Sequence, residues 1–377
     1  MIYLDNSAGT RPYSEVVGVI TDVLVNHWGN ASADNSFGKD AMAIIDSVTN
    51  QVAEDINCNL DEIIWTSGAC ESNSMAIMGV LNANDHMHFY TSHLEHTSIN
   101  EIVKNGTGHY TAFIYNDECG AINLLDLERK LHMSNEVGAK ILVSISAANS
   151  EIGVTQDLKA IADIVHKYGG ILHVDATQAY PWYQIDVKDL RIDLMSVSGQ
   201  KMHCVKGIGF LYVRDGIKLK PLIYGSQQDA RRGGTYATHL IAAFGKALEL
   251  TRQNCYKSNV SKYRDKLLWK LLKINGVRIN GLMNGTRLPN NISLTIDGVN
   301  ANTLVTMCDL MGVIIAKGSA CKSYEPKPSE TLLAIGLTPE QALNTIRISL
   351  DEFTTEEEID QAADIITKLV ERIRAEK

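Results

Sequence analysis

Short apolar runs alternate with longer, polar-faced segments through the middle of the chain. The runs are rich in Ile and Val and are bounded by small or polar residues, at residues 62–66, 88–92, 141–147, 171–175, 194–198 and 209–213. Runs of this length and composition predict buried strands. Between two of them, apolar residues recur at helical spacing over residues 158–168, and Gly169 and Gly170 predict the end of that helix. Strand, helix and strand in this order predict a crossover in a parallel sheet, and therefore an α/β fold.

The pattern changes after about residue 236. Two helical stretches and a strand-like run follow, at about 237–254, 259–274 and 291–298. Thr338 and Thr355 each begin a capping box, which predicts a further helix after each of them. We therefore predict a domain boundary near residue 255 and a smaller α+β domain after it. The pattern leaves open which part the N-terminal residues join.

Composition and charge narrow the class of protein. The chain has 377 residues, of which 45% are apolar and 21% charged, which is ordinary globular composition. A net charge of −9 argues against a general nucleic-acid or membrane-surface binder, and no apolar run approaches the roughly 20 residues of a membrane span. The first residues lack the pattern of a secretory signal, and the seven cysteines show no metal-binding spacing. We therefore expect a reduced, cytoplasmic enzyme without a metal site.

Two polar residues follow neighbouring apolar runs at the places where ligands bind in open parallel sheets. Asp175 ends one run, and Lys201 comes just after the next, 26 residues further on. Alone, Asp175 could bind a metal, act as a base, pair with a cationic ring or cap a helix. Alone, Lys201 could contact a phosphate, attack a carbonyl or lie solvated at the surface. As a pair they suit pyridoxal phosphate (PLP), which needs a lysine for the Schiff base and an acid beside its pyridinium nitrogen.

Two loops carry further candidate chemistry, each with a structural alternative. Small residues at 66–73 precede a helical stretch whose free N–H groups could cradle a phosphate, although such turns are also common without a ligand. Cys321 lies between small residues in a second loop. Lys317 or Lys322 could favour its thiolate form, which would make it reactive, or the thiol could be inert.

A histidine and an arginine complete the candidates. Four histidines lie between residues 86 and 96, with a spacing that favours structural or stacking roles over a metal site. Among them, His96 could stack on a planar cofactor ring. Arg347 lies within an apolar, strand-like run and needs a carboxylate partner, which could belong to a substrate or to a structural salt bridge.

Taken together, these segments resemble a cysteine desulfurase of the NifS/IscS-like branch, a PLP-dependent enzyme of fold type I. The matching motifs occur in order as TSGACES, LEHTS, ANSEIGV, HVDATQA, SGQK with KGIGFLY, GSACKS and RISL. The resemblance implies a large domain over residues 15–255, with a mainly parallel seven-stranded sheet flanked by helices. It also implies a small α+β domain that combines residues 1–14 with 256–377 and carries the Cys321 loop. The expected assembly is a homodimer with shared active sites.

The resemblance assigns the cofactor contacts residue by residue. Lys201 would form the Schiff base, Asp175 would pair with the ring nitrogen, and His96 would stack on the ring and carry protons. Gln178 would contact the phenolic oxygen, and Asn149 would also lie at the cofactor. The phosphate would be held by residues from both strand-end loops, namely Ala69, Cys70, Ser198 and Gln200, and by Thr235 reaching across from the partner subunit.

The implied reaction converts L-cysteine to L-alanine. Asn149 and Arg347 would hold the substrate carboxylate, and Cys321 would take the sulfur as a persulfide. An acceptor protein, either an iron–sulfur scaffold or a tRNA-thiolation enzyme, would then receive the sulfur. The chain stops at Lys377 without the longer tail that relatives use to dock a scaffold, so tRNA thiolation is at least as strongly expected.

The sequence departs from the family pattern at two phosphate positions. Gln200 replaces the usual histidine before the lysine, and Cys70 replaces the usual threonine. Because glutamine cannot carry charge, we hypothesise weaker phosphate retention than in a typical member. Two alternatives stay open: a selenocysteine lyase or other class-V PLP enzyme, and a non-catalytic paralogue that acts as a binding protein.

Overall fold

The structure, a computed structural model, describes residues 1–255, 259–281, 287–318 and 327–376. Its largest element is a seven-stranded sheet with the strand order β2-β8-β7-β6-β5-β3-β4. The strands are β2 (Ile63–Thr66), β3 (Met87–Ser92), β4 (Tyr110–Ile114), β5 (Lys140–Ser146), β6 (Ile171–Asp175), β7 (Leu194–Ser198) and β8 (Gly209–Val213). Every neighbouring pair is parallel except those of β8, which runs antiparallel to β2 and β7. The predicted α/β fold with a mainly parallel seven-stranded sheet is therefore confirmed.

Both faces of this sheet are covered by helices, because successive residues of a strand point to opposite faces. In β5, Ile141 and Val143 pack into one hydrophobic cluster, whereas Leu142 packs into another. The first cluster includes buried residues of α1 (Ser14–Asn26), α2 (Ser36–Ile56), α5 (Leu124–Glu136), α6 (Leu158–Lys167) and α7 (Thr238–Cys255). The second is closed by α3 (Ala69–Ala83) and α4 (Thr97–Asn105).

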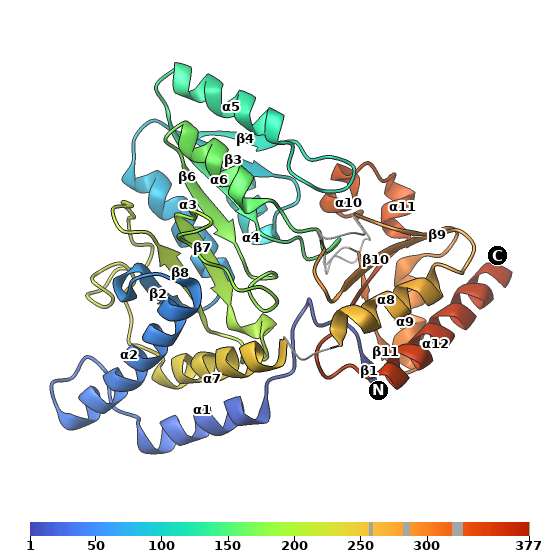
Figure 1. The fold of residues 1–377 in the computed structure, drawn as a ribbon, viewed down its shortest axis with the longest axis horizontal. Helices are drawn as coiled ribbons and strands as arrows, with labels where there is room; N and C mark the ends of the chain where they lie inside the picture. Colours follow the sequence, from blue (N-terminus) through green and yellow to red (C-terminus); the bar gives the residue numbers. More distant parts are fainter. Residues whose placement is uncertain (256–258, 282–286, 319–326, 377) are drawn as a thin grey trace.

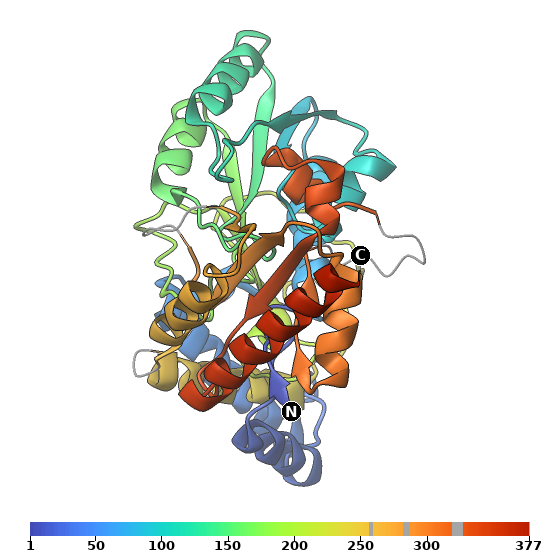
Figure 2. The ribbon, with the colours of Figure 1, turned by 90° about the vertical axis from the view of Figure 1, so that its right-hand side faces the viewer.

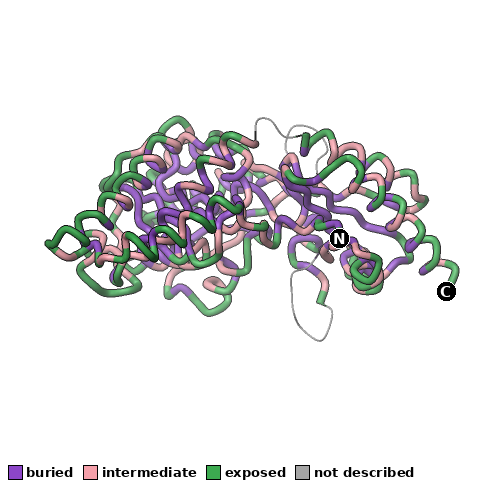
Figure 3. Tube along the Cα trace, turned by 90° about the horizontal axis from the view of Figure 1, so that it is seen from below, coloured by how far each residue is buried: buried purple, intermediate pink, exposed green. Residues whose placement is uncertain are grey.

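The C-terminal part has its own sheet and its own hydrophobic core. Its four-stranded sheet has the order β12-β13-β10-β9, with β9 (Val277–Ile279), β10 (Asn291–Ile296), β12 (Ala316–Lys317) and β13 (Thr345–Ser349). The helices are α8 (Val260–Leu271), α9 (Ala301–Leu310), α10 (Glu330–Ala334), α11 (Pro339–Leu343) and α12 (Glu356–Ala375), and α12 packs against α8 and α9 (Figure 2). Figure 3 shows the buried chain gathered in two regions, which match the two main clusters.

The N-terminal residues link these two parts. β1 (Ile2–Tyr3) pairs in parallel with β11 (Val313–Ile314), and Leu4 is fully buried in the C-terminal core. A few residues later, α1 packs along α7 on the other part of the molecule (Figure 1). The division of the chain into domains at residues 14 and 255 remains a prediction.

Leu4→Ala should lower the free energy of unfolding by about 2–5 kcal/mol, the usual cost of emptying a buried leucine site. Equilibrium urea unfolding of the full chain measures this change. Leu310→Ala is the matched control, because Leu310 ends α9 with 83% of its surface exposed. Equal destabilisation by the two changes would show that the N-terminal strand is not anchored in the C-terminal core.

Candidate active site

The strand ends of the large sheet bring Asp175 and Lys201 together. Asp175 is the last residue of β6, and Lys201 ends η2 (Gly199–Lys201), a one-turn 3-10 helix that directly follows β7. Because β6 and β7 are parallel neighbours, their carboxyl ends lie at the same edge of the sheet. The two side chains are close enough for their charges to interact.

The Lys201 amine is held by the backbone of the N-terminal segment. Its Nζ donates to the carbonyl oxygens of Ser7 and Ala8, both at 2.8 Å, and Gln178 Nε2 donates to the same Ser7 oxygen at 3.1 Å. Burial, together with the positive charge of Arg347, lowers the pKa of Lys201 to about 8. About a tenth of the amine is therefore uncharged at pH 7, far more than for an ordinary lysine, and a nucleophile or base must react in this form.

The Asp175 carboxylate is buried and fixed by two donors. Its Oδ1 accepts from the Thr177 backbone N–H at 3.0 Å, and its Oδ2 accepts from Asn73 Nδ2 at 2.8 Å. Asn73 lies in the second turn of α3, and the sequence analysis did not identify it. Each carboxylate oxygen still has capacity to accept a hydrogen bond from a bound ring nitrogen.

His96 caps the N-terminus of α4, at the same edge of the sheet. Its Nδ1 accepts from the Ser98 backbone N–H at 3.1 Å. Although part of the ring is open to solvent, the surrounding protein desolvates it and lowers its pKa, and the positive charge of Lys201 acts in the same direction. The ring is therefore neutral at physiological pH.

The predicted phosphate loop lies where α3 begins beside the end of β7. Gly68 adopts a φ of +142°, which favours glycine, and a Cβ atom there would lie 3.6 Å from Ser198 Oγ. Ala69 and Cys70 follow as the first helical residues, so their backbone N–H groups lack partners within the helix. Such an arrangement suits an anion. Behind the loop, Arg232 pairs with Glu71 at 2.7 Å, which neutralises that carboxylate.

Arg347 has a partner in the structure, and this partner is a protein carboxylate. The buried guanidinium of Arg347 in β13 pairs with Asp5 at 2.7 Å and donates to the Ser150 carbonyl oxygen at 3.3 Å. Its Nε has no hydrogen-bond partner among the described residues. Asn149 donates to the Leu94 carbonyl oxygen at 2.6 Å and accepts from the following turn. The structural salt bridge is thus present, and one buried donor of Arg347 remains for a ligand.

Gln200 and Thr235 make no side-chain hydrogen bond or ion pair within the described ranges. Gln200 precedes Lys201, and its backbone carbonyl oxygen accepts from the Thr10 hydroxyl and backbone N–H. Thr235 is exposed in the loop before α7. Cys321 lies outside the described residues. The site-residue assignments therefore stay predictions.

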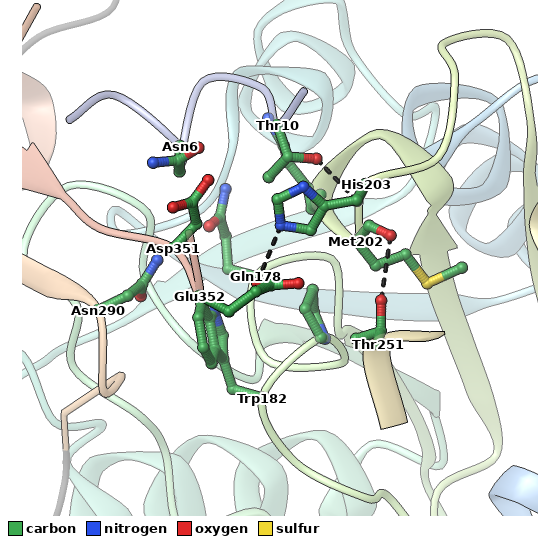
Figure 4. A pocket seen from close by; sticks show the side chains of 12 residues that line it. Asn6, Thr10, Gln178, Trp182, Met202, His203, Thr251, Asn290, Asp351 and Glu352 are labelled. Carbon is green, nitrogen blue, oxygen red and sulfur yellow. Dashed lines mark hydrogen bonds and ion pairs between the residues drawn. The ribbon is translucent and has the colours of Figure 1, made fainter. Parts of the chain in front are cut away.

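A cavity adjoins Lys201 and Gln178 between the two parts of the molecule (Figure 4). It is lined by residues of the N-terminal segment, the large sheet and its helices, and the C-terminal part, among them Asn6, Thr10, Trp182, Asn290, Asp351 and Glu352. At its wall, His203 Nε2 lies 3.0 Å from Glu352, which also accepts from the Tyr13 hydroxyl. Burial opposes the charged ring, but the hydrogen bond and charge of Glu352 outweigh it and raise the pKa of His203. This ion pair joins the two parts of the molecule.

The described residues were also compared with the requirements of a metal site and of a membrane-spanning helix. Within the described ranges, no group of three or more His, Cys, Asp or Glu side chains could hold a metal ion. Within the same ranges, no helix has the length and apolar character needed to cross a membrane.

Comparison with known proteins gives consistent results. Residues 2–362 match the sequence pattern of class-V aminotransferases. The chain is 33% identical to "Cysteine desulfurase IscS 1" of Archaeoglobus fulgidus, over 100% of this chain and 98% of that protein. A solved NifS-like protein superposes with a TM-score of 0.91 at 27% identity, covering 98% of this chain and 99% of its own. A structure of SspA in complex with cysteine superposes with a TM-score of 0.82 at 28% identity, covering 94% and 100%.

Labelling of the PLP-free protein with an amine-specific reagent should show Lys201 half-reactive near pH 8, because burial and Arg347 depress its pKa to about 8. Mass spectrometry of the labelled peptides at a series of pH values measures this. Lys218, which is exposed, is the internal reference for the reagent's own pH dependence. A Lys201 profile that coincides with that of Lys218 would contradict the prediction.

The His203–Glu352 pair should make stability fall as the pH rises. Because the folded-state pKa of His203 is raised, its stabilisation is complete below the ordinary histidine pKa of about 6.5 and is lost as pH rises through the folded value. Urea midpoints at about pH 6 and about pH 9 should therefore differ more for the wild type than for His203→Gln. His132→Gln, at an exposed histidine near Glu136, is the control and should keep the wild-type difference.

Proposed function

The chain belongs to the class-V aminotransferase family, and on that premise we propose that it is a PLP-dependent cysteine desulfurase. The observation that carries the proposal is the placement of Lys201 and Asp175 at neighbouring strand ends, with the pKa of the Lys201 amine lowered by its surroundings to about 8. The full-length likeness to a cysteine desulfurase and to a structure that contains cysteine supports L-cysteine as the substrate.

The residues present fit the cofactor. Gly68 leaves the space between α3 and Ser198 free of a side chain, and the first N–H groups of α3 are available to a phosphate. Ala69, Cys70, Ser198 and Gln200 would hold that phosphate, with Thr235 contributed by the partner subunit. Asp175 would accept from the ring nitrogen, Gln178 would donate to the ring hydroxyl, and Asn149 would lie beside the ring. When bound, PLP supplies an electron sink for the substrate's α-carbon.

The chain's own groups position the substrate and move its protons. Arg347, with its unused Nε donor, would bind the substrate carboxylate together with Asn149. Lys201 Nζ, once released from the Ser7 and Ala8 carbonyl oxygens, would take the α-proton, because its lowered pKa leaves a free amine. His96 would cover the ring.

We assign the sulfur transfer to Cys321 because of its sequence motif. Its thiolate attacks the substrate sulfur, an S–S bond forms, and the bond from that sulfur to the β-carbon breaks. The electron pair passes to the carbon side, and protonation there yields alanine while Cys321 keeps the persulfide. An acceptor protein of an iron–sulfur or tRNA-thiolation pathway would then collect the sulfur.

We further propose that the active form is a cytoplasmic homodimer. Trp28 and Phe37 stack at 5.1 Å between ring centroids, and both are more than half exposed. Tyr224, with 83% of its surface exposed, lies in the segment that leads to Thr235. Large apolar side chains left in solvent are typical of a surface that a second subunit covers.

Cys321→Ala should abolish cysteine-dependent alanine formation and leave PLP binding intact, because the thiolate is needed only for sulfur transfer. Alanine and sulfide assays, together with the absorbance of the bound cofactor, measure the two properties. Cys119→Ala is the matched control and should retain full activity. Alanine formation that survives in Cys321→Ala would point to a different class-V reaction, and a protein that binds no PLP would refute the proposal.

A further inference from the structure

A continuous row of hydrogen bonds joins Asp175 to His96. Asn73 Nδ2 donates to Asp175 Oδ2 at 2.8 Å and to Ser98 Oγ at 3.0 Å. Ser98 Oγ lies 2.8 Å from His96 Nδ1, and the Ser98 backbone N–H donates to the same nitrogen at 3.1 Å. The row connects the end of β6 with α3 and α4. Asn73, its central member, is fully buried.

The chemistry of the groups fixes the direction of each bond. A carboxylate only accepts, so the Asn73 amide must turn its nitrogen toward Asp175 and cannot flip. The second hydrogen on that nitrogen goes to Ser98 Oγ, which accepts it. Because the Ser98 backbone N–H already donates to His96 Nδ1, the Ser98 hydroxyl must also donate to that nitrogen. With the Ser98 backbone N–H also pointing at it, Nδ1 must be an unprotonated acceptor. In a neutral ring the proton then lies on Nε2.

We propose that Asn73 and Ser98 are positioning residues that hold His96 in the neutral tautomer protonated on Nε2 and couple its ring to the Asp175 carboxylate. The tautomer follows from the network alone, whereas its role in the reaction rests on the proposed function. An imidazolium would place a hydrogen on Nδ1, break the bond from the Ser98 backbone N–H and require the Ser98 hydroxyl to turn and accept. His96 therefore presents an Nε2–H donor to the bound reactants and has no lone pair there, which leaves the role of α-proton base to Lys201.

The charges around His96 agree with a neutral ring. Burial and Lys201 lower its pKa, and Asp175 is the group that raises it. Asn73 lies between Asp175 and Ser98 and occupies one oxygen of that carboxylate. Removing the amide should therefore make Ser98 Oγ a better acceptor for an Nδ1–H, and should leave Asp175 Oδ2 without its hydrogen bond from Asn73. Both effects favour a protonated Nδ1.

The experiment uses the full chain labelled with [15N]histidine, and two-bond proton–nitrogen correlation spectra distinguish protonated from unprotonated ring nitrogens. His96→Gln assigns the signal. In the wild type without PLP, His96 should show a single tautomer with protonated Nε2 and a pKa below the usual histidine value of about 6.5. In Asn73→Leu the pKa of His96 should rise by about half to one unit, as expected for the loss of one hydrogen bond. The neutral ring should keep its proton on Nε2, because the Ser98 backbone N–H still points at Nδ1.

Three further variants separate the effect of the hydrogen-bond row from other effects of substitution. Ser98→Ala retains the Asn73–Asp175 bond but removes the hydroxyl, and it should raise the pKa of His96 in the same direction. Ser98→Thr keeps a hydroxyl and should restore the wild-type spectrum. Ser74→Ala is the matched control in α3 and should change nothing, because among the described residues the Ser74 hydroxyl bonds to the Cys70 carbonyl oxygen and not to the row.

A wild-type His96 with a protonated Nδ1, or with mixed tautomers, would overturn the proposal. So would unchanged spectra in both Asn73→Leu and Ser98→Ala. Adding PLP and L-cysteine to the same samples distinguishes the positioning role from the proposed desulfurase function. A chain that shows the locked tautomer but binds no PLP or forms no alanine would refute the desulfurase function and leave the positioning role standing.

Discussion

The hydrogen bonds from Lys201 to the carbonyl oxygens of Ser7 and Ala8 tie the N-terminal segment to the end of the large sheet. The same short segment begins as a strand beside β11, buries Leu4 in the C-terminal core, and places Asp5 on Arg347. The lysine, the arginine and the two cores are thus held in one arrangement by fewer than a dozen residues. The two carbonyl oxygens order the amine, and burial keeps its pKa low although Asp5 of the same segment acts to raise it.

The large parallel sheet determines where the remaining site residues lie. Carboxyl ends of neighbouring parallel strands meet at one edge, so residues far apart in sequence, such as Asp175 and Lys201, become neighbours without special loops. The starts of α3 and α4 lie at that edge too, and they bring Asn73 and His96 to the same place. Short hydrogen bonds between side chains then set orientation and tautomer, which strand pairing alone cannot do.

Much of the large sheet and several of the site residues could be predicted from the sequence, for physical reasons. The six apolar runs became strands with ends within one residue of those expected, because strands buried on both faces leave an unbroken apolar signal. β4 was missed, because only Ile114 of this edge strand is buried. Asn73 was missed because its role depends on a contact with a residue 102 positions away. The lysine contacts of Ser7 and Ala8 use backbone oxygens, which carry no sequence signal. The open alternatives for Arg347 included a salt bridge, but nothing in the local pattern pointed to Asp5.

In the Asp5–Arg347 pair, a carboxylate of the protein itself would compete with a ligand carboxylate for Arg347. A ligand carboxylate that binds Arg347 through the nitrogen now paired with Asp5 must displace the Asp5 carboxylate. Because Asp5 belongs to the same chain as Arg347, its effective concentration is high and does not depend on the concentration of the ligand. The apparent affinity for such a ligand is lowered in proportion to the occupancy of the internal pair. Asp5 also lies two residues before Ser7, so the same short segment contacts both the arginine and the lysine.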